Sequence, residues 1–237
     1  MFKQFVAKAI AARRKKSIDK WSLNPILTQQ KVFKKLITSA SKTKFGLDHN
    51  FNKIKNHKDY VKNIPIRDYE GFKSYIELIK NGEKNILWKG APIYFAITSG
   101  TTSGTKYIPI TKESLPEHLN ASKNAIFLYI NETGNTSFLS GKFIFLQGSP
   151  ILGLEGVIKT GRLSGISAHH IPNYLQSNRL PSWETNCIED WEKKVDKIIE
   201  ETIDQDMTII GGIPSWVQTY FEKITKLKNK KIGDVFK

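Results

Sequence analysis

Cysteine is nearly absent from the sequence, and this limits the kind of protein it can be. The single cysteine, Cys187, cannot form a disulfide within the chain and has no partner at metal-ligand spacing. The adjacent His169 and His170 also make a poor metal site, because neighbouring side chains point in different directions and no acidic or cysteine partner lies at ligand spacing. We therefore expect a reducing compartment, the cytoplasm, and no protein-ligated metal.

Long apolar runs are missing as well. No stretch approaches the roughly 18 to 20 residues that cross a bilayer, and the first 20 residues lack the uncharged segment of a secretory signal. Those residues are basic and amphipathic, with Phe2, Phe5, Val6 and Ile10 on one side. We expect a helix docked on its domain; a transit peptide or a membrane-surface helix is the alternative.

Acidic residues are few compared with basic ones. The chain has 37 lysines and arginines against 22 acidic residues, a formal charge of +15, which favours anionic partners such as nucleotides or polyanions. Most of this charge is lysine, and basic runs interleaved with aromatics, which are typical of nucleic-acid readers, are few. We expect no nucleic-acid or membrane partner and keep a polyanion-binding protein as the non-enzymatic alternative. Nothing in the sequence indicates the oligomeric state.

Hydrophobic periodicity predicts an α/β fold. Apolar residues at helical spacing alternate with short apolar runs typical of buried strands, and the stretch 151–186 shows little periodicity and is expected to be irregular. The predicted architecture is an N-terminal helical region, residues 1–85, followed by a partial α/β domain, residues 86–237, with a mixed or parallel sheet flanked by helices. Helices are predicted over 25–44, 68–82, 111–134, 188–203 and 214–224, and strands over 93–97, 107–110, 142–146 and 207–210.

One loop concentrates the residue types that bind phosphate. It follows the strand at 93–97 and packs six hydroxyl side chains, two glycines and one lysine into nine positions. Glycines let backbone N–H groups come close to a ligand, hydroxyls donate hydrogen bonds to phosphate oxygens, and lysine adds a positive charge. We predict that ATP phosphates bind to its nine residues: Thr98, Ser99, Gly100, Thr101, Thr102, Ser103, Gly104, Thr105 and Lys106.

Better-known nucleotide loops do not match this segment. A Walker A loop needs four residues between its glycines and a hydroxyl after its lysine, whereas Gly100 and Gly104 are separated by three residues and Tyr107 follows Lys106. Dinucleotide-binding and α/β-hydrolase patterns are missing too. A flexible surface loop is the structural alternative; the strands on both sides disfavour it. The turn Gln147–Pro150 follows another predicted strand, and we hypothesise that it faces the same crevice.

The loop resembles the first ATP-binding motif of the adenylate-forming superfamily, and its surroundings resemble the GH3 acyl-acid amido synthetase family. Residues Ser103 to Tyr107 lack the proline before the lysine and the glycine after it that many members of the superfamily carry, which fits GH3 better than acyl-CoA synthetases. Similar landmarks appear in the family's order over nearly the whole chain: Phe45–Phe51, Ile64–Tyr69, the loop through Pro109, and Gly212–Trp216.

The resemblance implies an acid–amine ligase that uses ATP and Mg²⁺. A small carboxylic acid attacks the α-phosphorus of Mg-ATP to give an acyl-adenylate and pyrophosphate, and an amino acid or another amine then takes the acyl group. No protein nucleophile is needed, so no catalytic residue is assigned; Phe127 and Ile213 are possible acyl-pocket contacts. A carboxylate–CoA ligase is the alternative enzyme. Because relatives are longer, we expect this chain to be an amino-terminal portion that is inactive alone.

Overall fold

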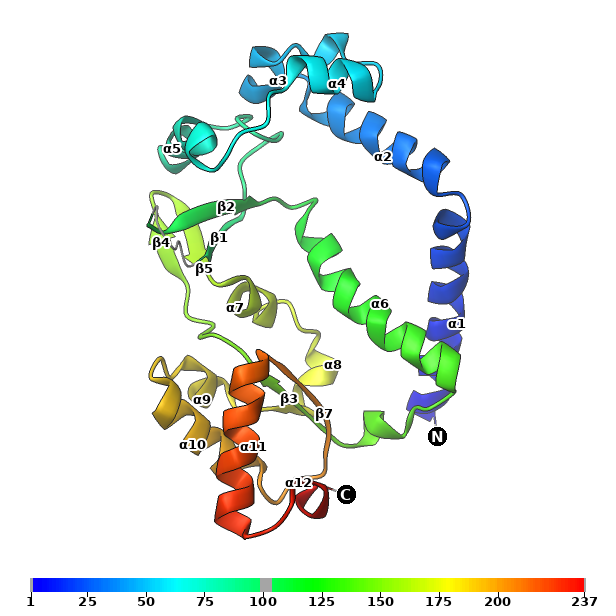
Figure 1. The fold of residues 1–237 in the computed structure, drawn as a ribbon, viewed down its shortest axis with the longest axis vertical. Coiled ribbons are helices and arrows are strands. Elements are labelled where there is room, and N and C mark those ends of the chain that lie inside the picture. Colours follow the sequence, from blue (N-terminus) through cyan, green and yellow to red (C-terminus); the bar gives the residue numbers. More distant parts are fainter. Residues whose placement is uncertain (1, 99–103, 237) are drawn as a thin grey trace. The chain divides into compact units, whose positions relative to one another are not determined.

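The computed structural model describes residues 2–98 and 104–236 (Figure 1). It divides into two compact units. We name the first the loop unit, which comprises Arg14–Ser122 and Leu152–Gly161, and the second the parallel-sheet unit, which comprises Met1–Arg13, Lys123–Ile151 and Arg162–Lys237. The predicted boundary near residue 85 stays a prediction.

The loop unit is helical over its first half. Three of its helix boundaries agree with the local sequence: Pro25 opens α2 in the first turn, where its missing N–H costs nothing, the Asp68 carboxylate accepts the Gly71 N–H (3.1 Å), and Gly82 follows α5 with a φ of 88°. The helix predicted over 25–44 ends at Ala40, and Lys44 begins a separate short helix that was not predicted. The helices are α1 (Phe2–Ser22, which the two units share), α2 (Pro25–Ala40), α3 (Lys44–Asp48), η1 (Phe51–Lys53), α4 (His57–Asn63), η2 (Glu70–Phe72) and α5 (Lys73–Lys80).

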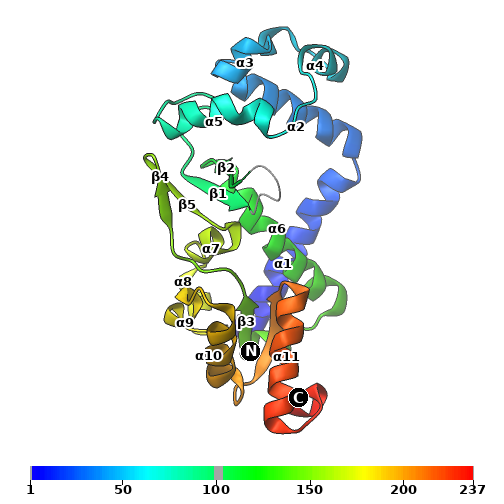
Figure 2. The same ribbon diagram turned by 60° about the vertical axis from the view of Figure 1, so that its left-hand side comes forward.

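A four-stranded mixed sheet completes the loop unit. Its order is β2-β1-β5-β4, with β1 antiparallel to β2 and parallel to β5. Helix α5 lies beside this sheet (Figure 2) and packs Ile76 and Ile79 into one core with Phe95 and Ile158. The strands are β1 (Tyr94–Thr98), β2 (Lys106–Ile110), β4 (Gly153–Glu155) and β5 (Ile158–Gly161).

The parallel-sheet unit is built on a three-stranded sheet of order β6-β3-β7, in which β3 is parallel to both neighbours. Helices α10 and α11 share one core with β3, centred on Ile144, Val195, Ile198 and Tyr220, all at most 1% exposed. The strands are β3 (Lys142–Leu146), β6 (Arg179–Leu180) and β7 (Met207–Gly212). The helices are α6 (Leu115–Thr133, shared), η3 (Ser137–Ser140), α7 (Leu163–Ala168), α8 (Asn173–Gln176), α9 (Trp183–Cys187), α10 (Trp191–Thr202), α11 (Pro214–Lys228) and α12 (Ile232–Val235).

The α/β architecture with a mixed sheet flanked by helices is confirmed. Thr111 lies before α6 as expected, and its hydroxyl accepts the Ser114 N–H (3.0 Å). The expectation of an irregular stretch at 151–186 is wrong, because β4, β5, α7, α8, β6 and α9 lie there. None of these elements exceeds six residues, so each offers too few positions for a periodic pattern to show.

The N-terminal helix forms as expected, but the face that it buries differs from the predicted one. Ala7 and Ala11 are 9% and 1% exposed and join Ile130 in one cluster, whereas Phe5 and Ile10 are 74% and 41% exposed. Alanine has the smallest side chain with a Cβ, which lets the α1 backbone come close to α6; a hydrophobicity pattern does not rank it above phenylalanine. Over residues 2–98 and 104–236, no helix has the length and apolar character needed to cross a bilayer.

Candidate phosphate-binding site

The predicted phosphate loop connects the two strands of a β-hairpin. Strands β1 and β2 pair in register from Tyr94↔Ile110 to Thr98↔Lys106, so the loop begins and ends at directly opposed residues. Thr98, Gly104 and Thr105 are exposed and Lys106 is half-buried. The five central residues of the prediction lie outside the described residues: Ser99, Gly100, Thr101, Thr102 and Ser103.

Gly104 has a backbone conformation that requires glycine. Its φ is 76°, in the left-handed region that side chains with a Cβ rarely adopt. Among the described residues, no atom lies within 4 Å of a Cβ built at this position. The glycine is therefore needed for the backbone conformation at the end of the loop.

Lys106 carries a positive charge that no carboxylate of the described residues neutralises. Among the described residues, no ion pair involves Lys106. Its Nζ lies 5.8 Å from the centre of the Tyr69 ring. A cation over an aromatic face is held weakly, so the ammonium can pair with an incoming phosphate without first breaking a salt bridge.

Strand β2 is fixed next to this lysine by Tyr107. The Tyr107 backbone N–H donates to the Tyr69 hydroxyl (2.8 Å), and the Tyr107 hydroxyl donates to Glu155 Oε2 (2.9 Å) on β4. The ring packs edge-on against Phe95 and lies under the Lys80 ammonium, 4.0 Å from the ring centre. The position of β2 therefore depends on side chains from four other segments of the loop unit.

The charges around Tyr107 compensate one another. Lys80 Nζ lies 3.1 Å from Glu155 Oε1 and 3.0 Å from Glu77 Oε1. Hydrogen bonds from Lys80 and then from Tyr107 lower the pKa of Glu155, and the hydrogen bond to Glu155 together with burial raises the pKa of Tyr107. At neutral pH, Glu155 is therefore ionised and Tyr107 is protonated, so this hydrogen bond persists.

The first two landmarks of the resemblance meet in the structure. Arg67 Nη2 donates to His49 Nε2 (2.7 Å), and His49 Nδ1 lies 2.9 Å from the Phe45 carbonyl oxygen. A guanidinium only donates and a carbonyl only accepts, so the His49 tautomer with its proton on Nδ1 satisfies both contacts. The Arg67 guanidinium also lies 5.6 and 5.5 Å from the Phe45 and Phe72 rings. This arrangement fixes the segment that leads to Tyr69.

A buried lysine in the parallel-sheet unit was not predicted. Lys194 on α10 is 3% exposed, and its ammonium donates to the carbonyl oxygens of Gln147 (3.1 Å) and Asn186 (2.6 Å). Burial lowers the pKa of Lys194 to about 8. The predicted turn Gln147–Pro150 is thereby tied to α10. Lys194 lies three residues after Trp191 and four before Ile198, within the apolar stripe of the helix, and this spacing could have identified it.

The two possible acyl-pocket residues have different surroundings. Phe127 packs against Ala7, Ala11 and Ile130, and Ile213, directly before α11, is 50% exposed. Their role in an acyl pocket stays a prediction.

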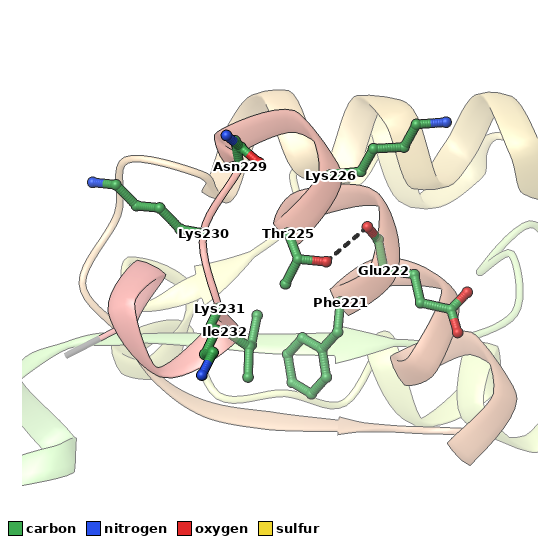
Figure 3. A pocket seen from close by; sticks show the side chains of 8 residues that line it. All are labelled: Phe221, Glu222, Thr225, Lys226, Asn229, Lys230, Lys231 and Ile232. Carbon is green, nitrogen blue, oxygen red and sulfur yellow. Dashed lines mark hydrogen bonds between the residues drawn. The ribbon is translucent and has the colours of Figure 1, made fainter.

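An open cavity of about 700 Å³ lies between α11 and α12 in the parallel-sheet unit. Three lysines line it, and Figure 3 shows the ammonium groups of Lys226, Lys230 and Lys231 pointing away from one another. The cavity therefore does not gather positive charge at one point as a phosphate site would.

Solved structures define the class of fold. The chain matches a structure of a GH3.15 acyl acid amido synthetase with a TM-score of 0.71 and 15% identity, covering 92% of this chain and 39% of that one. A structure of the AtGH3.15 acyl acid amido synthetase in complex with 2,4-DB matches with a TM-score of 0.62 and 17% identity, covering 84% of this chain and 36% of that one. At these identities the matches show the fold.

The sequence identifies the family. The GH3 family N-terminal domain matches residues 14–149, more than half of the chain, so the protein belongs to the GH3 family. Among curated relatives from Arabidopsis thaliana, indole-3-acetic acid-amido synthetase GH3.15 is 37% identical over 91 residues, covering 37% of this chain and 15% of that protein. Indole-3-acetic acid-amido synthetase GH3.2 is 26% identical over 141 residues, covering 52% and 26%. The chain thus spans a minor part of these relatives' length.

Proposed function

We propose that the loop Thr98–Lys106 binds the phosphates of Mg-ATP and that the protein takes part in ATP-dependent adenylation of a small carboxylic acid. One observation carries the proposal: within a GH3 N-terminal domain, a hairpin loop of hydroxyl residues ends on Lys106, which has no carboxylate partner among the described residues. Gly104 supports the proposal, because a residue without a side chain lets phosphate oxygens approach the backbone N–H groups.

The proposed reaction has two steps. The carboxylate oxygen attacks the α-phosphorus of ATP, the bond to the pyrophosphate oxygen breaks, and an acyl-adenylate forms; an amino acid or another amine then displaces AMP. In such a phosphoryl transfer, the protein mainly positions the reactants and stabilises charge on the phosphates. The Lys106 ammonium and the loop's N–H and hydroxyl donors supply that charge stabilisation.

Magnesium would arrive with the nucleotide. Mg²⁺ is commonly held by substrate phosphates, waters and one or two carboxylates. The described residues form no cluster of three or more His, Cys, Asp or Glu side chains able to hold a metal. The cytoplasm, which supplies Mg-ATP and keeps a lone cysteine reduced, is the proposed compartment.

Calorimetric titration with Mg-ATP at physiological ionic strength tests the proposal. We expect saturable binding that Lys106→Ala weakens at least about tenfold, which corresponds to about 1.4 kcal/mol. Lys112→Ala is the matched control, because it removes one equal charge from an exposed lysine just beyond β2. Circular dichroism checks that all variants fold. Equal losses in both variants would indicate a non-specific charge effect and contradict the assignment of the loop.

The net charge of +15 favours a second candidate, a protein that binds polyanions through its lysine-rich surface. Polynucleotide binding that falls steeply with salt and is unchanged by Lys106→Ala would support it.

Since the chain spans 36% to 39% of the matched structures, we expect no amide synthesis from these 237 residues alone; turnover by the purified chain would contradict this. In a longer protein, amine rather than thiol dependence separates an amido synthetase from a CoA ligase.

A further inference from the structure

Tyr69 contacts both the backbone and the side chain at the end of the phosphate loop. Strand β2 lies at one edge of the sheet β2-β1-β5-β4, so the described part of the chain offers it a strand partner on one side only. The Tyr107 N–H finds its acceptor in the Tyr69 hydroxyl, at 2.8 Å. Tyr107 directly follows Lys106, so its N–H belongs to the peptide bond that joins the two residues. The hydrogen bond therefore fixes the backbone next to the lysine.

The ring of Tyr69 also faces the lysine charge. Lys106 Nζ lies 5.8 Å from the ring centre. At this distance the interaction orients the ammonium but is weak compared with an ion pair. The lysine is thus oriented by a group that does not neutralise it, whereas Lys80, over the Tyr107 ring, forms ion pairs with Glu77 and Glu155.

Tyr69 itself is held in place. It packs against the core of the loop unit that contains Ile76, Ile79 and Phe95. Two residues before it, Arg67 bonds to His49 and lies against two aromatic rings. A ring supported in this way can serve as a fixed reference for a flexible lysine, because a binding group contributes most when its neighbours already restrict its motion.

We infer that Tyr69 is a positioning residue for Lys106: its hydroxyl anchors the backbone of β2 beside the lysine, and its ring orients the ammonium that the proposed function assigns to the phosphates of Mg-ATP. The inference rests on the proposed function, since it deepens the role of Lys106 in binding Mg-ATP. It also assigns the landmark Ile64–Tyr69 a role at the phosphate site. The sequence did not indicate this role.

A double-mutant cycle separates positioning from a general structural role. We expect Tyr69→Leu to weaken Mg-ATP binding about five- to tenfold, and Tyr69→Phe, which keeps the ring, to weaken it less. In a Lys106→Ala background, Tyr69→Leu should cause no further loss, because it acts through the lysine. Tyr60→Phe is the control: Tyr60 packs on Phe33 in the same unit, away from β2. Unchanged affinity in Tyr69→Leu, or losses that simply multiply, would overturn the inference.

NMR without nucleotide tests the contacts of Tyr69 with Lys106 and Tyr107 directly. By NMR, ring current from Tyr69 should shift the Lys106 ε-methylene protons upfield, and the Tyr107 amide should exchange slowly. We expect the shift to vanish in Tyr69→Leu and the amide to exchange faster in both Tyr69 variants. If neither changes, the inference is wrong, whether or not Lys106 binds ATP. If Lys106→Ala leaves ATP affinity intact, or the parent binds none, the proposed function fails and the positioning role fails with it.

Discussion

Lys106 of the loop unit and Lys194 of the parallel-sheet unit place the same side chain in opposite settings. Lys106 is half-buried beside an aromatic ring, and Lys194 is 3% exposed with its ammonium on two carbonyl oxygens. Neither has a carboxylate partner among the described residues. Solvent exposure and hydrogen-bond partners, rather than charge alone, therefore decide whether a lysine can bind a ligand or instead stabilises the fold.

Charge reversal should separate the two lysines most strongly. Lys194→Glu would place a buried carboxylate against the Gln147 and Asn186 carbonyl oxygens, and we expect it to lower the free energy of unfolding by about 4 kcal/mol or more. Lys106→Glu should change it by less than about 0.5 kcal/mol while abolishing Mg-ATP binding. Urea denaturation of each variant measures this. Lys193→Glu, at the exposed neighbour of Lys194, is the control; a loss there as large as at Lys194 would contradict burial as the cause.

Raising the pH should stabilise the fold through Lys194. Burial holds the pKa of Lys194 at about 8 in the folded chain, below the ordinary lysine value of 10.5. Between these values the unfolded chain binds the proton and the folded chain does not, so stability rises with pH. From pH 8 to 9.5 we expect a gain of about 1 to 2 kcal/mol that Lys194→Met lacks. Denaturation at both pH values tests it, and an equal gain in the Met variant would rule out Lys194 as the source.

The smallest expected effect concerns the loop backbone. Gly104→Ala should lower the free energy of unfolding by about 1 kcal/mol, since alanine is strained at a φ of 76°, and should weaken Mg-ATP binding. Gly233→Ala in α12, also with open space at its Cβ but no positive φ, should be neutral or slightly stabilising. Thermal unfolding of both variants checks this, and equal destabilisation would mean that φ is not the cause.

Local sequence patterns predicted the elements that are long or that are bounded by proline or glycine. The strands beside the loop, α2 after Pro25 and the turn after α5 at Gly82 agree with the structure because each depends on neighbouring residues. The short elements of 151–186 and the alanine face of α1 could not be predicted in this way. Their positions depend on partners distant in the sequence, such as β5 pairing with β1 and Ala11 packing with Ile130.

The candidate site divides in the same manner. The residue types at Thr98–Lys106 indicated phosphate from the sequence, although the central residues Ser99–Ser103 lie outside the described part and their roles stay a prediction. Tyr69 could not have been linked to this loop from the sequence, because 38 positions separate it from Tyr107, whose N–H donates a hydrogen bond to the Tyr69 hydroxyl. Lys194 was missed because a lysine in a helix is usually on the solvated side.

By itself, the sequence determined the α/β class, the GH3 resemblance and the prediction that the loop binds phosphate, since composition, periodicity and residue type are properties of neighbouring positions. Only the tertiary structure decided which lysine stays available and which is buried, which face of α1 is covered, and which tyrosine stands beside Lys106. Those outcomes depend on distances between segments far apart in the chain, and these are set by the packing of the whole core rather than by local preference.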